Sequence, residues 1–169
     1  GLLTPSVWQD RIDGCSRKIP NISMKVPTGG GKTLLAACAL GRISRDFFKR
    51  SRGLVLWVVP STTIYDQTFK ALANREHSYR KQLDLESGGR TKILNRKDSF
   101  NKQDTDDYLC VMVLMLQSFN VSKTSKDARK IYSDSGNYAS FFPNSDDYSA
   151  NNELLNKVPN LVEEDMLER

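Results

Sequence analysis

Residues 26–33 of this chain read Val-Pro-Thr-Gly-Gly-Gly-Lys-Thr, and the organisation of the fold follows from this stretch. Just upstream, the apolar residues Ile22, Met24 and Val26 alternate with polar residues, and this period of two predicts a short strand. Just downstream, residues 34–40 are rich in residue types that favour a helix. A strand, a glycine-rich loop, Lys-Thr and a helix in this order predict a P-loop, which binds phosphate groups.

The residue types in this loop suit a nucleoside triphosphate. Glycines let successive backbone N–H groups surround an anion, because larger side chains would collide with the phosphates. The helix that starts near Lys32 directs the positive end of its dipole toward the same anion. We expect the Lys32 ammonium to reach the β- and γ-phosphates and the Thr33 hydroxyl to be a ligand of Mg²⁺. ATP and Mg²⁺ are therefore the expected cofactors, and Lys32 and Thr33 are the expected catalytic residues.

The loop departs from the strict P-loop pattern, which has glycine at the position of Val26. The alternative interpretation is a glycine-rich turn between a strand and a helix that binds no ligand. The flanking strand and helix patterns favour the P-loop.

The composition is typical of a globular protein of one domain. The chain has 169 residues, of which 38% are hydrophobic and 27% charged, enough for a core and a polar surface. No apolar run is long enough to cross a membrane, and a cytoplasmic location is expected. The three cysteines are too far apart to predict a zinc site or a disulfide framework. The net charge of +5 favours a polyanionic partner.

The rest of the chain alternates between predicted strands and helices. Apolar runs predict strands at residues 53–60 and 108–116, the first covered on both faces, and a minor strand at 91–94. Helices are predicted over residues 4–15, 32–49, 62–72, 78–86, 126–132 and 151–157. Residues 95–107 are expected to form a loop and residues 121–159 a polar excursion from the sheet. This alternation predicts an α/β domain with a mostly parallel sheet.

A cluster of cations lies late in the predicted P-loop helix and just after it, between Arg42 and Arg52. Basic residues there stabilise the negative end of the helix dipole, which predicts a solvent-facing role for most of the cluster. A nucleic-acid role for these cations is the alternative.

Three segments carry a resemblance to a known family. They are M-K-V-P-T-G-G-G-K-T at residues 24–33, L-V-L-W-V-V-P-S-T-T-I-Y-D-Q-T-F-K-A-L at 54–72 and V-M-V-L-M-L-Q-S-F-N at 111–120. Their order resembles that of the first RecA-like domain of superfamily 2 helicases. The closest resemblance is to the motor subunit (Res, or R) of type III restriction endonucleases and related DEAD/DEAH-like helicases. It implies a P-loop NTPase fold, an incomplete one here, with helices on both faces of the sheet.

The resemblance implies a set of binding residues. Motif I, which holds ATP, would comprise Pro27, Thr28, Gly29, Gly30, Gly31, Lys32 and Thr33. Motif Ia, which contacts the DNA backbone, would comprise Pro60, Ser61, Thr62 and Thr63, with Gln117 and Ser118 forming a later backbone-contacting element. Gln9 would contact the adenine, and an exposed helical Gln beside a packed Trp is the alternative. Ordinary helix capping is the alternative role for Ser61 or Thr62.

The resemblance also implies that residues 1–169 are part of a first RecA-like domain. In that family an Asp-Glu element after an apolar strand holds Mg²⁺ and orients the attacking water. The acidic residues Asp106-Asp107, Asp146-Asp147 and Glu163-Glu164-Asp165 do not stand in that position. No second RecA-like domain and no nuclease motif is evident, and the start at Gly1 rather than Met also suggests a fragment.

The implied full-length protein is an ATP-dependent DNA translocase or helicase of a type III restriction system. Its expected partners are DNA, a second RecA-like domain of the same chain and a modification (methyltransferase) subunit. This chain alone is expected to be inactive as an ATP hydrolase. The alternatives are another P-loop NTPase, such as a kinase, and a nucleotide- or DNA-binding module without motor function.

Overall fold

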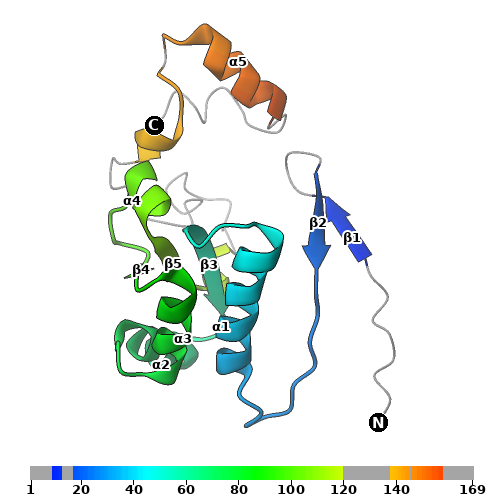
Figure 1. Ribbon diagram of the computed structural model, residues 1–169, viewed down its shortest axis with the longest axis vertical. Coiled ribbons are helices and arrows are strands. Elements are labelled where there is room, and N and C mark those ends of the chain that lie inside the picture. The colour runs from blue at the N-terminus through cyan, green and yellow to red at the C-terminus, as the bar shows by residue number, and fades with distance from the viewer. Residues whose placement is uncertain (1–8, 13–16, 120–137, 145, 158–169) are drawn as a thin grey trace. The chain divides into compact units, whose positions relative to one another are not determined.

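The computed structural model describes residues 9–12, 17–119, 138–144 and 146–157 (Figure 1). The chain divides into two compact units, which are described separately below. The larger unit, Thr28–Phe141, contains the P-loop segment and the parallel sheet. The smaller unit combines Gly1–Pro27 with Phe142–Arg169.

The larger unit is built on a three-stranded parallel sheet with the strand order β3-β5-β4. Its strands are β3 (Gly53–Val59), β4 (Thr91–Leu94) and β5 (Leu109–Met115), which confirms the predicted strands. Parallel strands require crossover connections, and helices provide them here. The connecting helices are α2 (Thr62–Ala73), α3 (Ser78–Ser87) and α4 (Lys102–Asp107).

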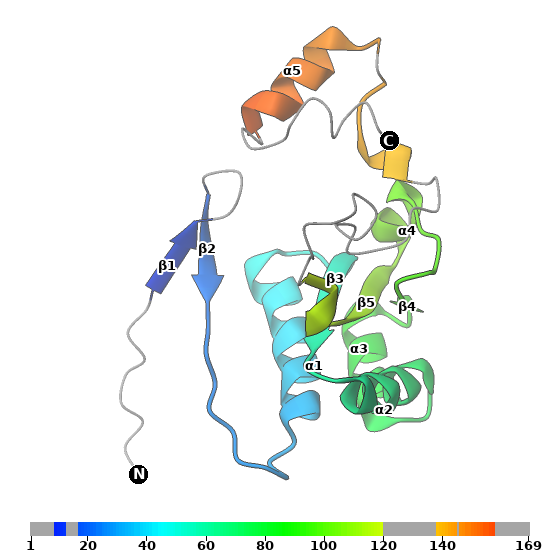
Figure 2. The same cartoon turned by 180° about the vertical axis from the view of Figure 1, so that it is seen from behind.

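The central strand β5 is buried on both faces, which explains its continuous apolar sequence. On one face, Leu109, Val111 and Val113 pack in a core that also includes residues of α1, α2 and α3. On the other face, Cys110, Met112 and Leu114 pack with Leu94, Phe100 and Phe141. The predicted α/β fold, with a parallel sheet flanked by helices, is therefore confirmed (Figures 1 and 2).

The edge strand β3 differs from β5, because only one of its faces is covered in the described part of the chain. Val55 and Trp57 pack against the helical core. On the opposite face, Leu54, Leu56 and Val58 are 46%, 49% and 41% exposed. The prediction that this strand is covered on both faces is therefore wrong for the described residues. A continuous apolar run shows only that both faces of a strand are apolar. Whether a face is buried depends on which other elements pack against it.

The helix after the P-loop runs close to its predicted length. It comprises α1 (Lys32–Arg42) and a π-helical continuation, η1 (Ile43–Phe47). Ala37 and Leu40 of α1 enter the core beside α2 and α3. At Gly41, α1 approaches α3 so closely that an added Cβ would lie 2.3 Å from the Cγ of Glu86. Glycine at this position therefore sets the distance between the P-loop helix and α3.

The smaller unit corrects two predictions. The residues from Gln9 to Ile12 form β1, not a helix, and β1 pairs antiparallel with β2 (Lys18–Asn21). The strand predicted from Ile22, Met24 and Val26 is not present, since residues 22–27 form no strand. Ile22 and Met24 are 59% and 54% exposed, so their alternation with polar residues does not face a core. A hairpin partner supplies backbone hydrogen bonds that local spacing does not reveal.

The region 95–107, predicted to be a loop, contains α4. Its start is stabilised by a capping box, in which Asn101 and Asp104 each accept a hydrogen bond from the other's backbone N–H. In the described residues after β5 there are two short 3₁₀ helices, η2 (Leu116–Phe119) and η4 (Tyr138–Phe141). Helix α5 (Tyr148–Lys157) confirms the helix predicted at 151–157, and the one predicted at 126–132 lies outside the described residues.

A buried arginine joins three elements of the larger unit. The Nε of Arg80, whose side chain is 6% exposed, donates to both carboxylate oxygens of Asp84 at 2.9 Å. Its Nη1 donates to the Leu72 carbonyl at 3.3 Å and its Nη2 to the Thr91 carbonyl at 2.9 Å. Arg80, near the start of α3, therefore ties this helix to the end of α2 and to the start of β4. None of the described helices combines the length and apolarity needed to cross a membrane.

The close approach of α1 and α3 leads to a stability prediction. Gly41→Ala should lower the free energy of unfolding by about 1–3 kcal/mol, because the Glu86 side chain must move away. Its carboxylate would then lose its ion pair with Arg45, an Nη1–Oε2 distance of 3.0 Å. Urea denaturation followed by circular dichroism measures the change.

The control is the same substitution in a Glu86→Ala background. There the clash is absent, and alanine should be neutral or stabilising by up to about 1 kcal/mol because it favours a helix over glycine. An equal loss in both backgrounds would show that the contact with Glu86 is not the cause.

Candidate nucleotide and nucleic-acid site

The backbone of the glycine-rich loop explains its composition. Gly29 and Gly31 have φ angles of 79° and 70°, in the left-handed region that residues with a Cβ rarely adopt. A Cβ added to either residue would meet nothing within 4 Å. Glycine is therefore required here by the turn, and the open space beside it leaves room for a ligand to approach the backbone.

The first turn of α1 is suited to an anion. Gly31 is its N-cap residue and makes no side-chain capping hydrogen bond, and the first turn contains no acidic residue. The helix begins there, since the Leu35 N–H donates to the Gly31 carbonyl at 2.9 Å. The N–H groups of the first turn of any helix have no acceptor within the helix, and its dipole attracts negative charge. A phosphate group would meet these N–H groups without repulsion from a neighbouring carboxylate.

The predicted motif I residues lie together in one short segment. Thr28 to Gly31 form the turn, and Lys32 and Thr33 are the first two residues of α1. Lys32 is exposed and Thr33 is half-buried. Pro27 belongs to the smaller unit, as does Gln9, which lies in β1 opposite Asn21. The roles of these residues in binding nucleotide stay predictions.

The predicted motif Ia residues follow β3 directly. Pro60 and Thr63 are exposed, and Ser61 is the N-cap of α2, where its Oγ accepts a hydrogen bond from the Ile64 N–H at 3.4 Å. Thr62 Oγ1 donates to the Sδ of Met115 at 3.5 Å, a contact that the sequence interpretation did not anticipate. Helix capping, the alternative role considered for Ser61, is therefore present in the structure.

The later element, Gln117 and Ser118, lies beside motif Ia. Val59 and Met115 are register partners, so β3 and β5 end side by side. Gln117 is exposed in η2, directly after β5, and the Ser118 side chain is outside the described residues. Figure 1 shows that α1 begins at the end of the sheet toward which β3 points. The parallel topology thus brings the P-loop and both predicted DNA-contacting elements to one end of the sheet.

The acidic residues do not form a metal site in the described part of the chain, where no group of three His, Cys, Asp or Glu side chains converges. Asp106 and Asp107 end α4 and precede β5, at the other end of the sheet. Asp104 binds Lys92 at 2.8 Å, and this hydrogen bond lowers the pKa of its carboxyl. Glu163, Glu164 and Asp165 lie outside the described residues. The open backbone of the loop suits a phosphate group, and Thr33 stays the predicted ligand for Mg²⁺.

Comparison with known proteins identifies one family. The model of a family described as type III restriction enzyme, res subunit, matches residues 7–149, which include both candidate elements and the P-loop. No curated protein and no solved structure gives a significant match.

A substitution at Lys32 tests the phosphate site. Lys32→Ala should weaken ADP binding at least tenfold, because a hydrogen bond to a charged group contributes about 1.5–3 kcal/mol. The fold should be unchanged, since Lys32 is exposed. Isothermal titration calorimetry measures the affinity. Lys25→Ala, which removes an equal charge from an exposed position just before the loop, should bind ADP normally. Unchanged affinity in the Lys32 variant would overturn the P-loop assignment.

Proposed function

Because the chain belongs to the family of type III restriction enzyme res subunits, we propose that it is the ATP-binding part of a DNA motor. In this proposal the full-length protein is an ATP-dependent translocase or helicase of a type III restriction system. The observation that supports it most is the arrangement of the larger unit. The start of α1, the start of α2 and the end of β5 lie at one end of the parallel sheet.

The residues of the loop would hold the nucleotide through its phosphates. The N–H groups at the start of α1 would bind phosphate oxygens, and Lys32 would neutralise part of their charge. The Thr33 hydroxyl, at the second position of the helix, would be a ligand of the Mg²⁺ that accompanies ATP. Hydrolysis of bound ATP to ADP and phosphate would supply the free energy for the motor.

The residues after β3 and β5 would hold DNA through its backbone. Thr63 and Gln117 are exposed polar side chains, and the start of α2 presents backbone N–H groups. Such groups bind phosphates and do not distinguish base sequences. The Ser61 hydroxyl already caps α2. The Ser61 backbone and the Thr63 side chain would therefore make the contacts with the DNA backbone.

The position of these elements also bears on the alternatives. A kinase or another P-loop NTPase would share the loop, and a binding module without motor function would share both elements. The motor is favoured because the family match covers the P-loop and the segments after β3 and β5 together. The proposal implies a second RecA-like domain in the full-length chain and one protein partner, a modification (methyltransferase) subunit.

Binding of DNA should be weak, independent of sequence and steeply reduced by salt, because phosphate contacts release counterions. Thr63→Glu should weaken it severalfold, since it places a negative charge beside the proposed backbone contact. Gln67→Glu adds the same charge one turn later on an exposed position of α2 and should have less effect. Fluorescence anisotropy at several salt concentrations measures both. Binding that persists at high salt would contradict the proposal.

This chain by itself should bind ATP without sustained hydrolysis. No Asp-Glu pair directly follows a strand in the described ranges, the position from which an acidic residue would orient the attacking water. An arginine supplied from across the nucleotide contributes about 10³- to 10⁵-fold in related enzymes, and a second domain would have to supply it. A phosphate-release assay with and without DNA tests this, with Lys32→Ala as the blank. DNA-stimulated release above that blank would contradict it.

A further inference from the structure

A second candidate site lies at the other end of the sheet. A pocket of about 730 Å³ opens where η1 ends and β3 begins. Its lining includes Lys49, Arg50, Arg52, Leu54, Asp106 and Phe141. In Figure 1, β3 starts at this end and points toward the start of α1, so the pocket and the P-loop are at opposite ends of the strand.

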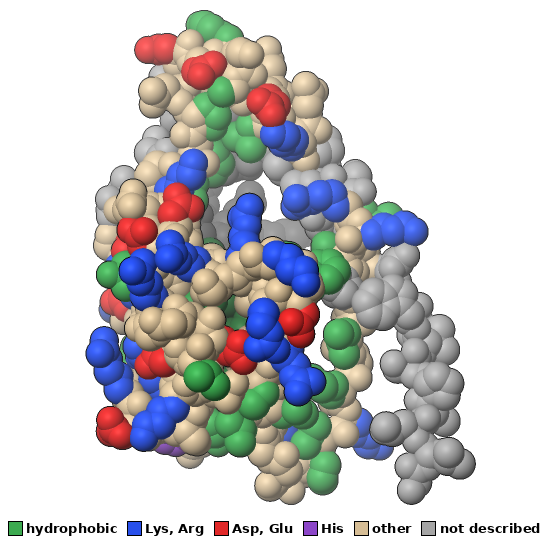
Figure 3. All heavy atoms as spheres, viewed as in Figure 1, with side chains coloured by type: hydrophobic (Ala, Val, Ile, Leu, Met, Phe, Trp, Pro, Cys, Tyr) green, Lys and Arg blue, Asp and Glu red, His purple; other side chains and the backbone are tan. Residues whose placement is uncertain are grey.

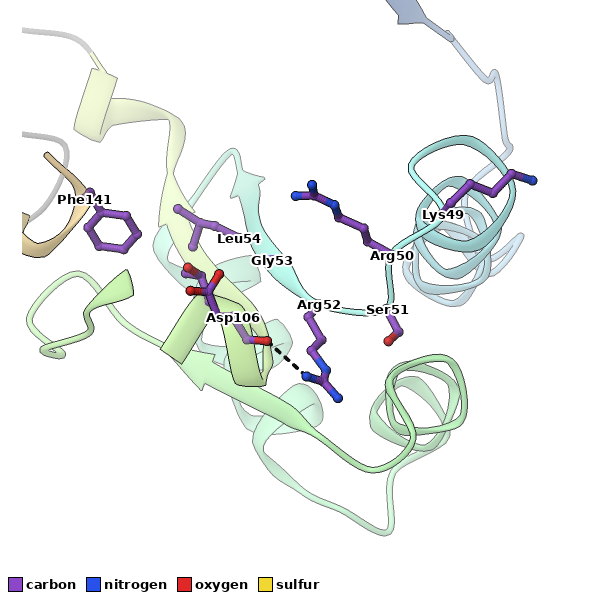
Figure 4. Close-up of a pocket in the computed structure, with 9 residues that line it drawn as sticks. Lys49, Arg50, Ser51, Arg52, Gly53, Leu54, Asp106 and Phe141 are labelled. Atoms are coloured by element: carbon purple, nitrogen blue, oxygen red, sulfur yellow. Dashed lines mark hydrogen bonds between the residues drawn. The ribbon is translucent and has the colours of Figure 1, made fainter. Parts of the chain in front are cut away.

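The structure divides the cations between Arg42 and Arg52 into groups with different roles. Arg45 pairs with Asp46 and with Glu86, each at 3.0 Å, and so links η1 to α3. Arg52 donates from Nη1 to the Asp106 carbonyl at 3.3 Å. The guanidinium of Arg50 has no ion pair or hydrogen bond within the described part of the chain. In Figure 4 it points into the open space of the pocket, whereas the Lys49 side chain points away.

The direction of Arg50 follows from a turn of the backbone at Lys49. Lys49 has a φ of 54°, the one positive φ among the described residues that are not glycine. This conformation reverses the chain after η1, and the Arg50 N–H donates to the Ser44 carbonyl at 2.9 Å. A left-handed conformation at a residue with a long side chain is uncommon. The hydrogen bond to Ser44 therefore anchors the backbone that carries Arg50.

The opposite wall of the pocket is apolar. Leu54 is 46% exposed, and the Phe141 ring packs on Phe100 with their centroids 5.7 Å apart. In Figure 4 the Phe141 ring and Leu54 lie across the open space from Arg50. The Asp106 carboxylate would repel an anion placed beside it, which leaves the Arg50 side for a negative group. Figure 3 shows other Lys and Arg side chains on the viewed face, in keeping with the net charge of +5.

We propose that this pocket binds a nucleoside phosphate. Its phosphate would pair with Arg50, and its base would lie against Leu54 and Phe141. A cation that faces an aromatic and aliphatic wall is the combination by which proteins hold nucleotides and single strands. The volume of the pocket also falls in the range of small-molecule sites. The ligand is either a free nucleotide or a nucleotide unit of a single strand, and the site does not depend on the P-loop.

The test uses the full 169-residue chain with Lys32→Ala in every sample, so that the P-loop does not contribute. Fluorescence anisotropy of a labelled oligothymidylate measures binding at several salt concentrations. Arg50→Ala should weaken binding about tenfold and reduce the slope of log affinity against log salt by about 0.7, as for one lost phosphate contact. Arg42→Ala, an exposed cation of α1 outside the pocket, is the matched control and should change affinity less than twofold.

Two further variants test the apolar wall. Phe141→Leu should weaken binding about fivefold or more with an unchanged salt slope, because stacking carries no charge. Leu54→Asp should also weaken binding. Because Leu54 is partly exposed, this effect should not arise from a loss of core packing. Thermal melting shows whether each variant is folded.

Competition distinguishes the source of the ligand. If unlabelled thymidine monophosphate displaces the labelled probe as well as unlabelled oligothymidylate does at the same concentration of nucleotides, the ligand is a free nucleotide. If only the unlabelled oligothymidylate displaces the probe, the ligand is a single strand. The proposal is overturned if Arg50→Ala and Arg42→Ala lose affinity equally. It is also overturned if inorganic phosphate competes as well as thymidine monophosphate, since the base would then contribute nothing.

Discussion

The larger unit depends on the burial of one strand. β5 forms hydrogen bonds with a parallel neighbour on each side, and both of its faces are covered by apolar side chains. A strand in that position satisfies its backbone groups and removes seven largely apolar residues from water at once. The helices that cover it take their positions from this strand. Arg80 then fixes α2, α3 and β4 relative to one another through hydrogen bonds to two carbonyls and a carboxylate.

The P-loop helix takes its position from the same core. Ala37 and Leu40 pack with the residues of β5, and Gly41 allows α1 to lie against α3. The loop before α1 contributes no strand in the described residues, so helix packing, not a strand pairing, holds the predicted phosphate-binding segment in place. This arrangement separates two requirements. The loop is open and rich in glycine, and its position depends on the helix that follows it.

The two ends of the sheet have different chemical character. At the carboxyl ends of β3 and β5 lie helix starts, neutral polar side chains and Lys32, the groups proposed above to bind phosphates. At the amino end of β3, a pocket is lined by guanidinium groups and an aromatic ring. The same strand connects the two ends, because β3 starts beside the pocket and ends beside the start of α2.

The sequence by itself determined the elements whose signals are local. The strands at β3, β4 and β5, the helices α1, α2 and α3 and the α5 helix follow from apolar runs, caps and breakers. The glycines of the loop and Lys32 were also recognisable, because the P-loop is a contiguous pattern. The capping box of α4 has a local signal, Asn101 and Asp104 three positions apart, that an all-polar segment made easy to miss.

Only the tertiary structure decided which apolar faces are covered, because coverage depends on residues distant in sequence. It leaves Leu56 exposed although its strand reads as fully buried, and it pairs β1 with β2 where spacing indicated a helix. It also separated Arg45, which pairs with Glu86, from Arg50, which points into a pocket, although both belong to one basic run. Composition fixes the charge of such a run, but the direction of each side chain depends on the turn at Lys49 and on what packs across from it.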